Sequence, residues 1–440
     1  MASKAGVRIS QCMIVKNEER NIRKALSWGK DIMWEQIVVD TGSTDRTVDI
    51  AREMGAHVCE FPWNDDFAAA KNYAIEQCKG DWIALLDADE YMALEDVRRL
   101  PGIIRELHGR NMDGLSTGWQ QLDDDGKISA SGTQVRFFRN APDIRYQRRI
   151  HEQLVSTEGR ELHLGDGVAD LSIFHTGYQK ENREGKKKSG RNRKLIQEEL
   201  KAHPADYEMM GYLGDEYLSE DEKGEAVTWY LRSIQHMPAK LRENDQRSAV
   251  TFTRVLTLYS EQENLSWEQA KEIYQKAVSL LPKEADFDYV AGHFFAVRGH
   301  MEQAISHLET ALQKLNAYGC NNRALLLAAN LLDAYELLTR CCYEAGQKEK
   351  CASYGVGYLK SNPYNMAVLS WLLLTLLPEE RQGAGEYPAI LEFLSKIYDF
   401  SLAKDKLFVV KAAQMSQREA YASFTANQLF TQEEKMLLKL

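Results

Sequence analysis

The sequence has 440 residues, of which 44% are hydrophobic and 27% are charged, a composition typical of ordinary globular proteins. This length predicts two or three domains of roughly 100–200 residues each. The formal net charge of −10 argues against broad binding of nucleic acid, which requires a basic face. The first residues, MASKAGVRIS, contain no apolar segment of the kind found in signal peptides, and no stretch approaches the roughly 18 apolar residues of a membrane span. We therefore expect a cytoplasmic protein.

The cysteines carry no metal-binding pattern. There are seven of them, without a C-x-x-C pair or a regular spacing, and most have apolar neighbours. This pattern favours buried free thiols in a reducing compartment and argues against a zinc site.

Strand and helix signals alternate in the N-terminal part of the chain. Strands are predicted at residues 8–15, 35–40, 56–61 and 82–86, and helices at 21–28, 44–54 and 66–77. Elements of this length in this order predict βαβ units and a parallel sheet. Further extended segments are predicted at residues 114–122, 132–139 and 168–175. We expect them to extend the sheet in mixed orientation and to complete one domain over residues 1–185.

Helical periodicity replaces the strand signals after residue 194. Gly224-Glu225-Ala226, Tyr230 and Pro238 have the same spacing as Glu268-Gln269-Ala270, Tyr274 and Pro282. Gly299 with Ala304 and Gly346 with Cys351 repeat part of this pattern, and Pro204 precedes Pro238 by 34 residues, the period of tetratricopeptide repeats. Small residues allow helices to pack closely, and prolines end them. We predict a helical-repeat domain over residues 186–440, with an irregular helical domain as the alternative.

Polar segments follow three of the predicted strands, at the sheet edge where open parallel sheets bind ligands. They are Lys16-Asn17-Glu18, the segment from Asp40 to Asp45, and Asp87-Ala88-Asp89. Asp87 and Asp89 project to the same side and would repel each other without a cation between them. Such hard oxygen ligands suit Mg2+ or Mn2+ with a phosphate-bearing ligand. The sequence lacks G-x-G-x-x-G and Walker A patterns, which argues against a dehydrogenase or a P-loop enzyme.

Four ordered motifs carry a resemblance to a known family. They are Met13-Ile14-Val15-Lys16-Asn17-Glu18-Glu19, Val39-Asp40-Thr41-Gly42-Ser43-Thr44-Asp45-Arg46-Thr47, Asp66-Phe67-Ala68-Ala69-Ala70-Lys71-Asn72 and Leu86-Asp87-Ala88-Asp89-Glu90. In this order they resemble family 2 glycosyltransferases of the GT-A fold, a Rossmann-like α/β architecture with a mostly parallel sheet.

The continuation of the chain resembles one bacterial subgroup of that family. The resembling segments are Ile150-His151-Glu152-Gln153-Leu154, Phe174-His175-Thr176-Gly177-Tyr178, and Arg191-Asn192 before Glu199-Leu200. Members of the subgroup have a C-terminal all-α, tetratricopeptide-like (TPR-like) region. They include peptide glycosyltransferases of the sublancin S-glycosyltransferase type, which modify a bacteriocin, and some surface or flagellar glycosyltransferases.

The resemblance implies where the nucleotide of a sugar donor would bind. Asp40 would hydrogen-bond the base, and the main chain near Ile14 and Val15 would line the same pocket. Asn17 and Glu18, which belong to the first motif, are expected beside it.

The resemblance also implies how the diphosphate would be held. Asp89 would ligate a Mn2+ or Mg2+ ion bridging the diphosphate, and Asp87 would contact the ribose or metal-bound water as a further candidate ligand. Ala88 lies between them. His175 would be a second ligand of the metal or diphosphate, and Lys71 would meet a phosphate as a point charge.

Glu152 occupies the place of the acidic base in the family, and we expect it to accept the proton of the acceptor. With one base on the acceptor side, attack is in line and inverts the anomeric centre. His151 is the second candidate base, since an unperturbed histidine titrates near neutrality, with a structural role as its alternative. Asp45 is expected to begin a helix, and Trp119 to pack in the core.

The sequence therefore predicts a metal-dependent, inverting hexosyltransferase that uses a UDP-sugar, with a peptide or protein side chain as acceptor. One alternative acceptor is a lipid-linked or cell-surface glycan, and another reading is a catalytically inactive repeat scaffold. The helical repeats could also pair two copies of the chain in a homodimer. The basic stretch at residues 180–194 is either an exposed helix face or a lid over the diphosphate.

Overall fold

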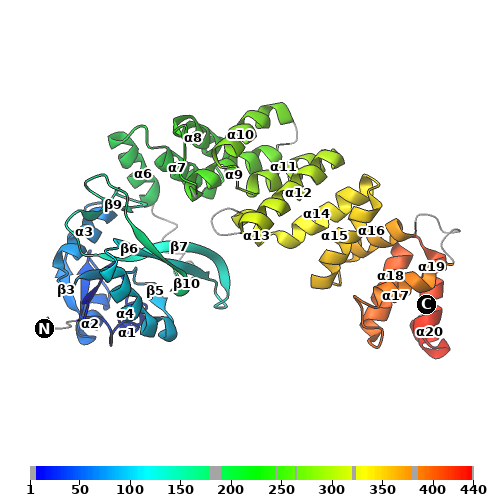
Figure 1. Cartoon of the computed structure of the whole chain (residues 1–440), viewed down its shortest axis with the longest axis horizontal. Helices are drawn as coiled ribbons and strands as arrows, with labels where there is room; N and C mark the ends of the chain where they lie inside the picture. The colour runs from blue at the N-terminus through cyan, green and yellow to red at the C-terminus, as the bar shows by residue number, and fades with distance from the viewer. Residues whose placement is uncertain are drawn as a thin grey trace. The chain divides into compact units, whose positions relative to one another are not determined.

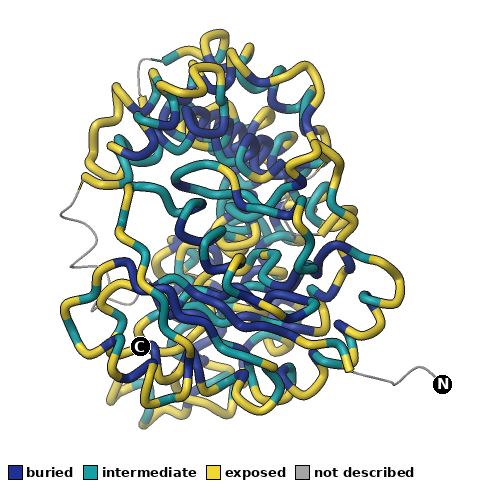
Figure 2. Tube along the Cα trace, turned by 90° about the vertical axis from the view of Figure 1, so that its left-hand side faces the viewer, coloured by how far each residue is buried: buried dark blue, intermediate teal, exposed yellow. Residues whose placement is uncertain are grey.

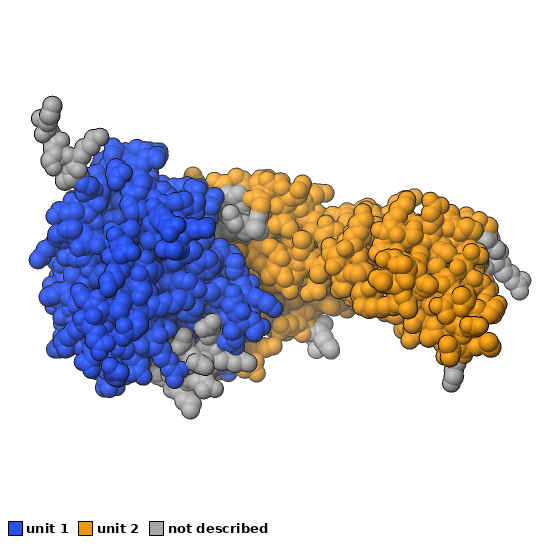
Figure 3. All heavy atoms as spheres, turned by 90° about the horizontal axis from the view of Figure 1, so that it is seen from below, with its two compact units in different colours: residues 1–220 blue, residues 221–440 orange. Residues whose placement is uncertain are grey.

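The computed structural model describes residues 6–177, 190–243, 245–262, 265–319, 324–377 and 385–438. The chain divides into two compact units, residues 1–220 and 221–440, which Figure 3 colours separately. The sequence predicts a boundary at residue 185, whereas helices α6 (Arg191–Ala202) and α7 (Tyr207–Ser219) belong to the first unit. Ion pairs and a ring contact that join these helices to the first unit account for this difference, and they are described with the site.

The first unit is built on an eight-stranded sheet with the strand order β3-β2-β1-β4-β7-β6-β10-β5 (Figure 1). Its strands are β1 (Ile9–Val15), β2 (Glu35–Asp40), β3 (His57–Glu60), β4 (Trp82–Leu85), β5 (Glu90–Met92), β6 (Gly114–Leu122), β7 (Ile128–Arg139) and β10 (Leu164–His175). Strands β3, β2, β1 and β4 run parallel. Strand β7 is antiparallel to β4 and β6, β10 is parallel to β6, and β5 is antiparallel to β10. The predicted parallel sheet with a mixed extension is confirmed.

Helices cover both faces of this sheet because its strands are apolar on both sides. Helices α1 (Ile22–Ser27), α2 (Thr47–Glu53) and α4 (Leu94–Gly109) pack on one face. Helix α3 (Phe67–Gln77) packs on the other, together with the two-stranded sheet of β8 (Ile144–Gln147) and β9 (Gln153–Ser156). Figure 2 shows the sheet strands as a largely buried layer. Trp82 and Leu85 of β4 are fully buried, and each buried side chain of that size stabilises the fold by about 1.5–3 kcal/mol.

Helix α2 begins later than predicted, and Asp45 explains why. Its carboxylate accepts hydrogen bonds from the Thr47 backbone N–H at 2.9 Å and from the Glu19 backbone N–H at 3.2 Å. These bonds keep residues 44–46 in the loop and tie that loop to the one after β1. Asp45 thus acts at the start of the helix, as the sequence predicts.

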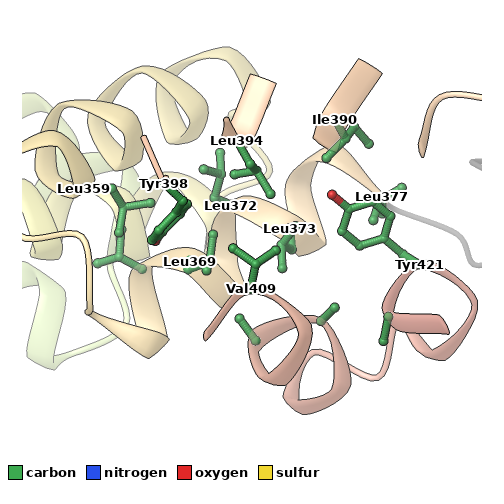
Figure 4. Packing of buried hydrophobic residues seen from close by; sticks show 14 of the residues in the cluster. Leu359, Leu369, Leu372, Leu373, Leu377, Ile390, Leu394, Tyr398, Val409 and Tyr421 are labelled. Atoms are coloured by element: carbon green, nitrogen blue, oxygen red, sulfur yellow. The ribbon is translucent and has the colours of Figure 1, made fainter. Parts of the chain in front are cut away.

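The second unit contains only helices among its described residues. They are α8 (Lys223–His236), α9 (Gln246–Ser260), α10 (Trp267–Leu280), α11 (Asp286–Val297), α12 (Met301–Tyr318), α13 (Leu325–Ala329), α14 (Leu331–Glu344), α15 (Lys348–Ser361), α16 (Met366–Leu376), α17 (Tyr387–Leu394), α18 (Ala403–Met415), α19 (Glu419–Leu429) and α20 (Gln432–Leu438). Figure 4 shows Leu369 and Leu372 of α16 packed near Val409 of α18 in one buried cluster. The predicted all-α domain is confirmed.

The small residues of the repeat pattern lie where helices meet. Ala226, Ala270, Ala304 and Cys351 each leave at most 1% of their surface exposed. Helices α8 and α10 end just before Pro238 and Pro282. Gly299 and Gly346 adopt positive φ angles of 78° and 69° in the turns before α12 and α15, a conformation that glycine adopts without a steric penalty.

Six cysteines in the described part of the chain are free thiols, five of them buried; Cys320 lies outside the described residues. None of the described helices combines the length and the apolar character needed to cross a bilayer.

Candidate active site

The predicted ligand-binding edge lies where β1, β2 and β4 end side by side. The three strands are adjacent and parallel, and Val15, the last residue of β1, is paired with Asp40, the last residue of β2. Strand β4 ends at Leu85, so Asp87 follows at the same edge. The fold thus gathers the polar segments that the sequence places after these strands.

Asp40 holds the turn that follows β2. Its carboxylate accepts hydrogen bonds from the backbone N–H groups of Gly42 and Ser43 at 3.1 Å. Gly42 has a φ angle of 106°, which permits this tight turn because glycine lacks a Cβ. Asp40 is 7% exposed, and its contact with a nucleotide base stays a prediction.

Asn17 and Glu18 join the loops after β1 and β2. Asn17, at a φ angle of 57°, donates from its backbone N–H to Ser43 Oγ at 2.9 Å and accepts from the Thr44 N–H at 2.8 Å. The Glu18 backbone N–H donates to Thr47 Oγ1 at 2.7 Å. These bonds give both residues a structural role in shaping the edge, and their contact with a nucleotide stays a prediction.

Three further positions of the predicted nucleotide pocket lie at or just after the ends of β1 and β4. Ile14 and Val15 end β1, Ile14 half-buried and Val15 3% exposed. Ala88 is buried in the same apolar cluster as Val15.

Lys71 is a buried cation that joins two carboxylates. It lies on α3, whose start is fixed by Asp66, since the Asp66 side chain accepts a hydrogen bond from the Ala69 N–H at 2.8 Å. Lys71 is 3% exposed, and its Nζ lies 2.5 Å from Glu152 Oε1 and 3.4 Å from Asp87 Oδ1. Burial alone would lower the pKa of Lys71, but the two carboxylates outweigh it and hold that pKa well above its ordinary value. Lys71 is therefore a permanent positive charge between these two residues.

Arg136 of β7 is a second buried cation, and sequence reasoning missed it. Its Nη2 donates to Asp87 Oδ2 at 2.9 Å and to Glu90 Oε1 at 2.7 Å. The Glu90 side chain is 1% exposed and that of Arg136 12%. Burial raises the pKa of Asp87, but Lys71 and Arg136 together hold it well below its ordinary value. Asp87 is thus fixed as a carboxylate between two cations, and its role as a metal ligand stays a prediction.

Glu90 extends this network to His175. Its carboxylate accepts from Trp119 Nε1 at 3.0 Å. The Trp119 ring packs against the His175 ring with centroids 4.9 Å apart. His175 Nδ1 lies 2.7 Å from Gln121 Oε1, so that Gln121 and Trp119 fix the orientation of the imidazole. Trp119, which the sequence analysis assigned to the core, supports a predicted ligand.

Asp89 and His175 form the pair that fits a divalent cation. Asp89 Oδ2 lies 3.5 Å from His175 Nε2. Both atoms lie close to the Cα of Gly177, because a Cβ added to Gly177 would collide with Asp89 Oδ2 and lie 2.6 Å from His175 Nε2. Within the described part of the chain, no three His, Cys, Asp or Glu side chains are grouped to hold a metal. A two-residue site fits Mg2+ or Mn2+, which bind phosphates through one or two protein ligands and keep several positions for water and phosphate oxygens.

The formal charges of the cluster agree with this fit. Three carboxylates, Asp87, Glu90 and Glu152, contact the two cations Lys71 and Arg136, which leaves one negative charge. Asp89, which contacts His175 rather than either cation, adds a second, and two negative charges complement one divalent ion.

Adding a side chain at position 177 is expected to weaken metal binding. We expect Gly177→Ala to lower the affinity for Mn2+ in the presence of UDP about 10–100-fold, a size typical of changes beside metal ligands, because the new methyl group would displace Asp89 or His175. This affinity is measured by titrating the protein with Mn2+ and recording the electron paramagnetic resonance signal of the free ion. Gly132→Ala is the matched control, since a Cβ at Gly132 meets nothing within 4 Å; equal affinities in the two variants would contradict the assignment.

The two candidate bases lie in the loop between β8 and β9. The Glu152 side chain is 16% exposed. Burial raises its pKa, but the adjacent Lys71 reverses the effect and holds the pKa below its ordinary value. His151 stacks flat on Tyr212 of α7, with ring centroids 3.6 Å apart and planes 5° apart. This contact favours a structural role for His151 and leaves Glu152 as the stronger candidate.

Residues 178–189, which hold most of the basic stretch, lie outside the described residues. The predicted lid therefore stays a prediction. Lys194, at the end of that stretch, lies on α6 and pairs with Asp65 at 2.8 Å.

Comparison with known proteins decides the family of the N-terminal part. Residues 10–108 match the family model described as "Glycosyl transferase family 2". The first unit carries a family 2 glycosyltransferase domain. The motifs from Met13 to Glu90 lie within the matched residues, so the predicted family is confirmed for this domain.

Two relatives extend this similarity beyond the domain. A TPR repeat-containing protein from Synechococcus elongatus is 33% identical over 236 residues, covering 52% of this chain and 57% of that protein. The SPbeta prophage-derived glycosyltransferase SunS from Bacillus subtilis is 29% identical over 243 residues, covering 53% of this chain and 54% of SunS. The chain thus spans little more than half the length of these relatives. Their names agree with the predicted combination of a family 2 glycosyltransferase and helical repeats.

Among solved structures, glucosyl-3-phosphoglycerate synthase from Mycobacterium tuberculosis, in complex with Mn2+, UDP and glucosyl-3-phosphoglycerate, is 24% identical. The match covers 28% of this chain and 46% of that one, with a TM-score of 0.22. A similarity of this size carries no argument about the site.

Proposed function

We propose that this chain is a metal-dependent, inverting glycosyltransferase that moves a sugar from a UDP-sugar to a peptide or protein side chain. The observation that carries the proposal is a set of two residue pairs. Asp89 Oδ2 lies 3.5 Å from His175 Nε2, Lys71 and Glu152 form a largely buried ion pair, and Asp87, two residues before Asp89, contacts Lys71 at 3.4 Å. One pair suits the leaving diphosphate and the other suits the acceptor.

On the donor side, the residues must stabilise the charge that develops on the departing diphosphate. Asp89 and His175 would hold Mn2+ or Mg2+, which when bound supplies positive charge to the phosphate oxygens. Lys71 is a fixed positive charge whose pKa stays far above neutrality, and it adds to the same field. Asp40, at the end of β2, would orient the base of the nucleotide.

On the acceptor side, Glu152 would accept the proton that the attacking group loses. Its lowered pKa keeps it ionised at neutral pH but makes it a weak base. A weak base is better suited to a thiol acceptor, whose pKa is about 8.5, than to a hydroxyl acceptor. A single carboxylate on this side fits in-line attack and inversion. Helical repeats, which often offer extended peptide-binding surfaces, support a peptide or protein acceptor.

Intact-mass analysis tests this proposal. The full chain is incubated with Mn2+, a panel of UDP-sugars and short peptides containing Cys, Ser, Thr or Asn, and we expect a peptide to gain the mass of one sugar. UDP release with a lipid-linked glycan and with none of the peptides would favour the alternative acceptor. No binding of any UDP-sugar in calorimetry with Mn2+ present would favour the inactive scaffold.

The pH dependence of transfer separates the two candidate bases. Because the adjacent Lys71 holds the pKa of Glu152 below its ordinary value, its carboxylate stays ionised as the pH falls from neutrality into the mildly acidic range. With saturating Mn2+, we therefore expect kcat/KM to show no base-dependent decline between pH 8 and pH 5. Glu152→Gln should lower kcat about 10²–10⁴-fold. A decline between pH 8 and pH 5 that His151→Gln removes would assign the base to His151.

A further inference from the structure

The loop that carries Glu152 has backbone φ angles that are unfavourable for its residue types. It runs from Arg148 to Glu152, between β8 and β9. Arg148 and His151 have φ angles of 75° and 50°, in a region that residues with a side chain seldom occupy. Such conformations persist only where the surroundings impose them, and they are common at functional sites. Something outside the loop must hold it.

Helix α7 supplies much of that support. The Arg148 guanidinium pairs with Asp206, Nη2 to Oδ2 at 3.0 Å, and with Glu208. Gln153 Nε2 donates to the same Glu208 at 2.8 Å, and the His151 ring stacks on Tyr212. Glu208 is 4% exposed, so these are buried contacts, in which charge-assisted bonds hold firmly.

Helix α6 and helix α3 hold the middle of the loop. The Arg149 backbone N–H donates to Glu199 Oε2 of α6 at 3.1 Å. The Arg149 carbonyl accepts from the N–H of Phe67, the first residue of α3, at 2.8 Å. Helix α3 carries Lys71, whose Nζ contacts Glu152. The loop is therefore fastened on one side to the helix of Lys71 and on the other to α6 and α7.

We propose that Glu208 and Tyr212 of α7 are positioning residues, which hold the loop so that Glu152 faces the acceptor. This inference rests on the proposed function, because it takes Glu152 as the base. A displacement of about 1 Å at a reacting group can lower a rate about 10²-fold. Helices α6 and α7, which lie in the range that the sequence assigns to the helical repeats, thus complete the catalytic unit.

The contacts of α7 predict which step a change would affect. They reach the loop that carries Glu152, whereas His175 is held by β10, Gln121 and Trp119. Asp89 is held by its contacts with His175 and Thr176. Loss of Tyr212 should therefore slow proton transfer from the acceptor and leave binding of UDP and Mn2+ intact.

The test compares Tyr212→Ala with Tyr212→Phe in the full chain. UDP release from UDP-glucose is measured with Mn2+ and the mixture of peptides containing Cys, Ser, Thr or Asn. We expect Tyr212→Ala to lower the kcat of this reaction about 10–100-fold. Its Kd for UDP with Mn2+, measured by calorimetry, should stay within about twofold of wild type, and Tyr212→Phe, which keeps the ring, should restore kcat. Tyr217→Ala is the matched control, because Tyr217 lies further along α7 against the Arg193 guanidinium and should leave kcat unchanged.

A second variant guards against misfolding of the first. Glu208→Gln keeps the shape of the side chain but removes the charge that Arg148 meets, and the same loss of kcat without loss of UDP affinity is expected. The positioning role would be overturned if Tyr212→Ala and Glu208→Gln both kept the wild-type kcat. It would also be overturned if their affinity for UDP fell by as large a factor as their kcat. Wild-type kcat in Glu152→Gln would instead overturn the base assignment of the proposed function, so the two failures are distinguishable.

Discussion

Replacing Asp89 by alanine is expected to lower kcat/KM for UDP-sugar about 10³-fold or more. Asp89 Oδ2 and His175 Nε2 lie 3.5 Å apart beside Gly177, and loss of one ligand would remove most of the affinity for Mn2+ or Mg2+. A metal ion stabilises a developing charge by several kcal/mol. Each 1.36 kcal/mol added to the activation barrier slows the reaction tenfold. UDP release measured across a Mn2+ titration gives the size of the loss.

The fold should survive this substitution, which makes the result interpretable. The Thr176 N–H donates to the main-chain oxygen of Asp89 at 3.0 Å, and Thr176 Oγ1 donates to the same oxygen at 3.1 Å. Truncation of the side chain removes neither bond. Asp124→Ala, in an exposed turn, is the control and should keep wild-type kcat/KM. If Asp89→Ala kept its Mn2+-dependent activity, the metal site would lie elsewhere.

Much of the candidate site could be predicted because it depends on short-range patterns. Alternating strand and helix signals fixed the parallel order, and a parallel sheet brings the ends of its strands to one edge. Asp40 and Asp87 follow such ends, so their neighbourhood could be inferred from position alone. The family resemblance implied a phosphate contact for Lys71 and a base role for Glu152, but it did not predict the ion pair that joins them at 2.5 Å.

Arg136 and Glu90 could not be predicted in the same way, because long-range pairing brings them together. Strand β7 enters the sheet antiparallel to β4, and that register places Arg136 beside Asp87. A local signal did exist, since Arg136 interrupts an otherwise apolar run from Val135 to Phe138. A charge beside buried apolar residues needs partners of opposite sign, yet the sequence does not say which carboxylates they are.

The boundary at residue 185 illustrates the same difficulty for domains. The change from strand to helix signals marks where secondary structure changes, not where a compact unit ends. Arg148 pairs with Asp206 and Glu208, nearly sixty residues away, and such contacts leave no periodicity in the sequence. Its helical structure alone would assign α7 to the repeats, whereas the ion pairs with Arg148 join it to the first unit.

Replacing Arg136 by methionine is expected to destabilise the first unit by about 3–5 kcal/mol, the usual effect of removing one partner of a buried ion pair. Most of this loss should come from Glu90, which is 1% exposed and would keep its charge without its cation. Asp87 is 38% exposed and still contacts Lys71, so it should contribute little. Hydrogen exchange of the β4 backbone amides, followed by mass spectrometry on the full chain, isolates the first unit from the helical one. Protection there should fall about 10²–10³-fold or more.

Two further variants identify unpaired charge as the cause. Arg110→Met removes an arginine from an exposed pair with Glu106 at 3.3 Å and should change stability by less than about 0.5 kcal/mol. Arg136→Met combined with Glu90→Gln removes the buried charge together with its cation and should recover part of the lost protection. The amide oxygen at position 90 can still accept from Trp119 Nε1, which now donates to Glu90 at 3.0 Å, but the amide NH2 cannot replace the oxygen that accepts from the Asp87 N–H at 3.0 Å. If the double variant were as unstable as Arg136→Met alone, the loss would arise from packing of the long arginine side chain, and the electrostatic account of Glu90 would be wrong.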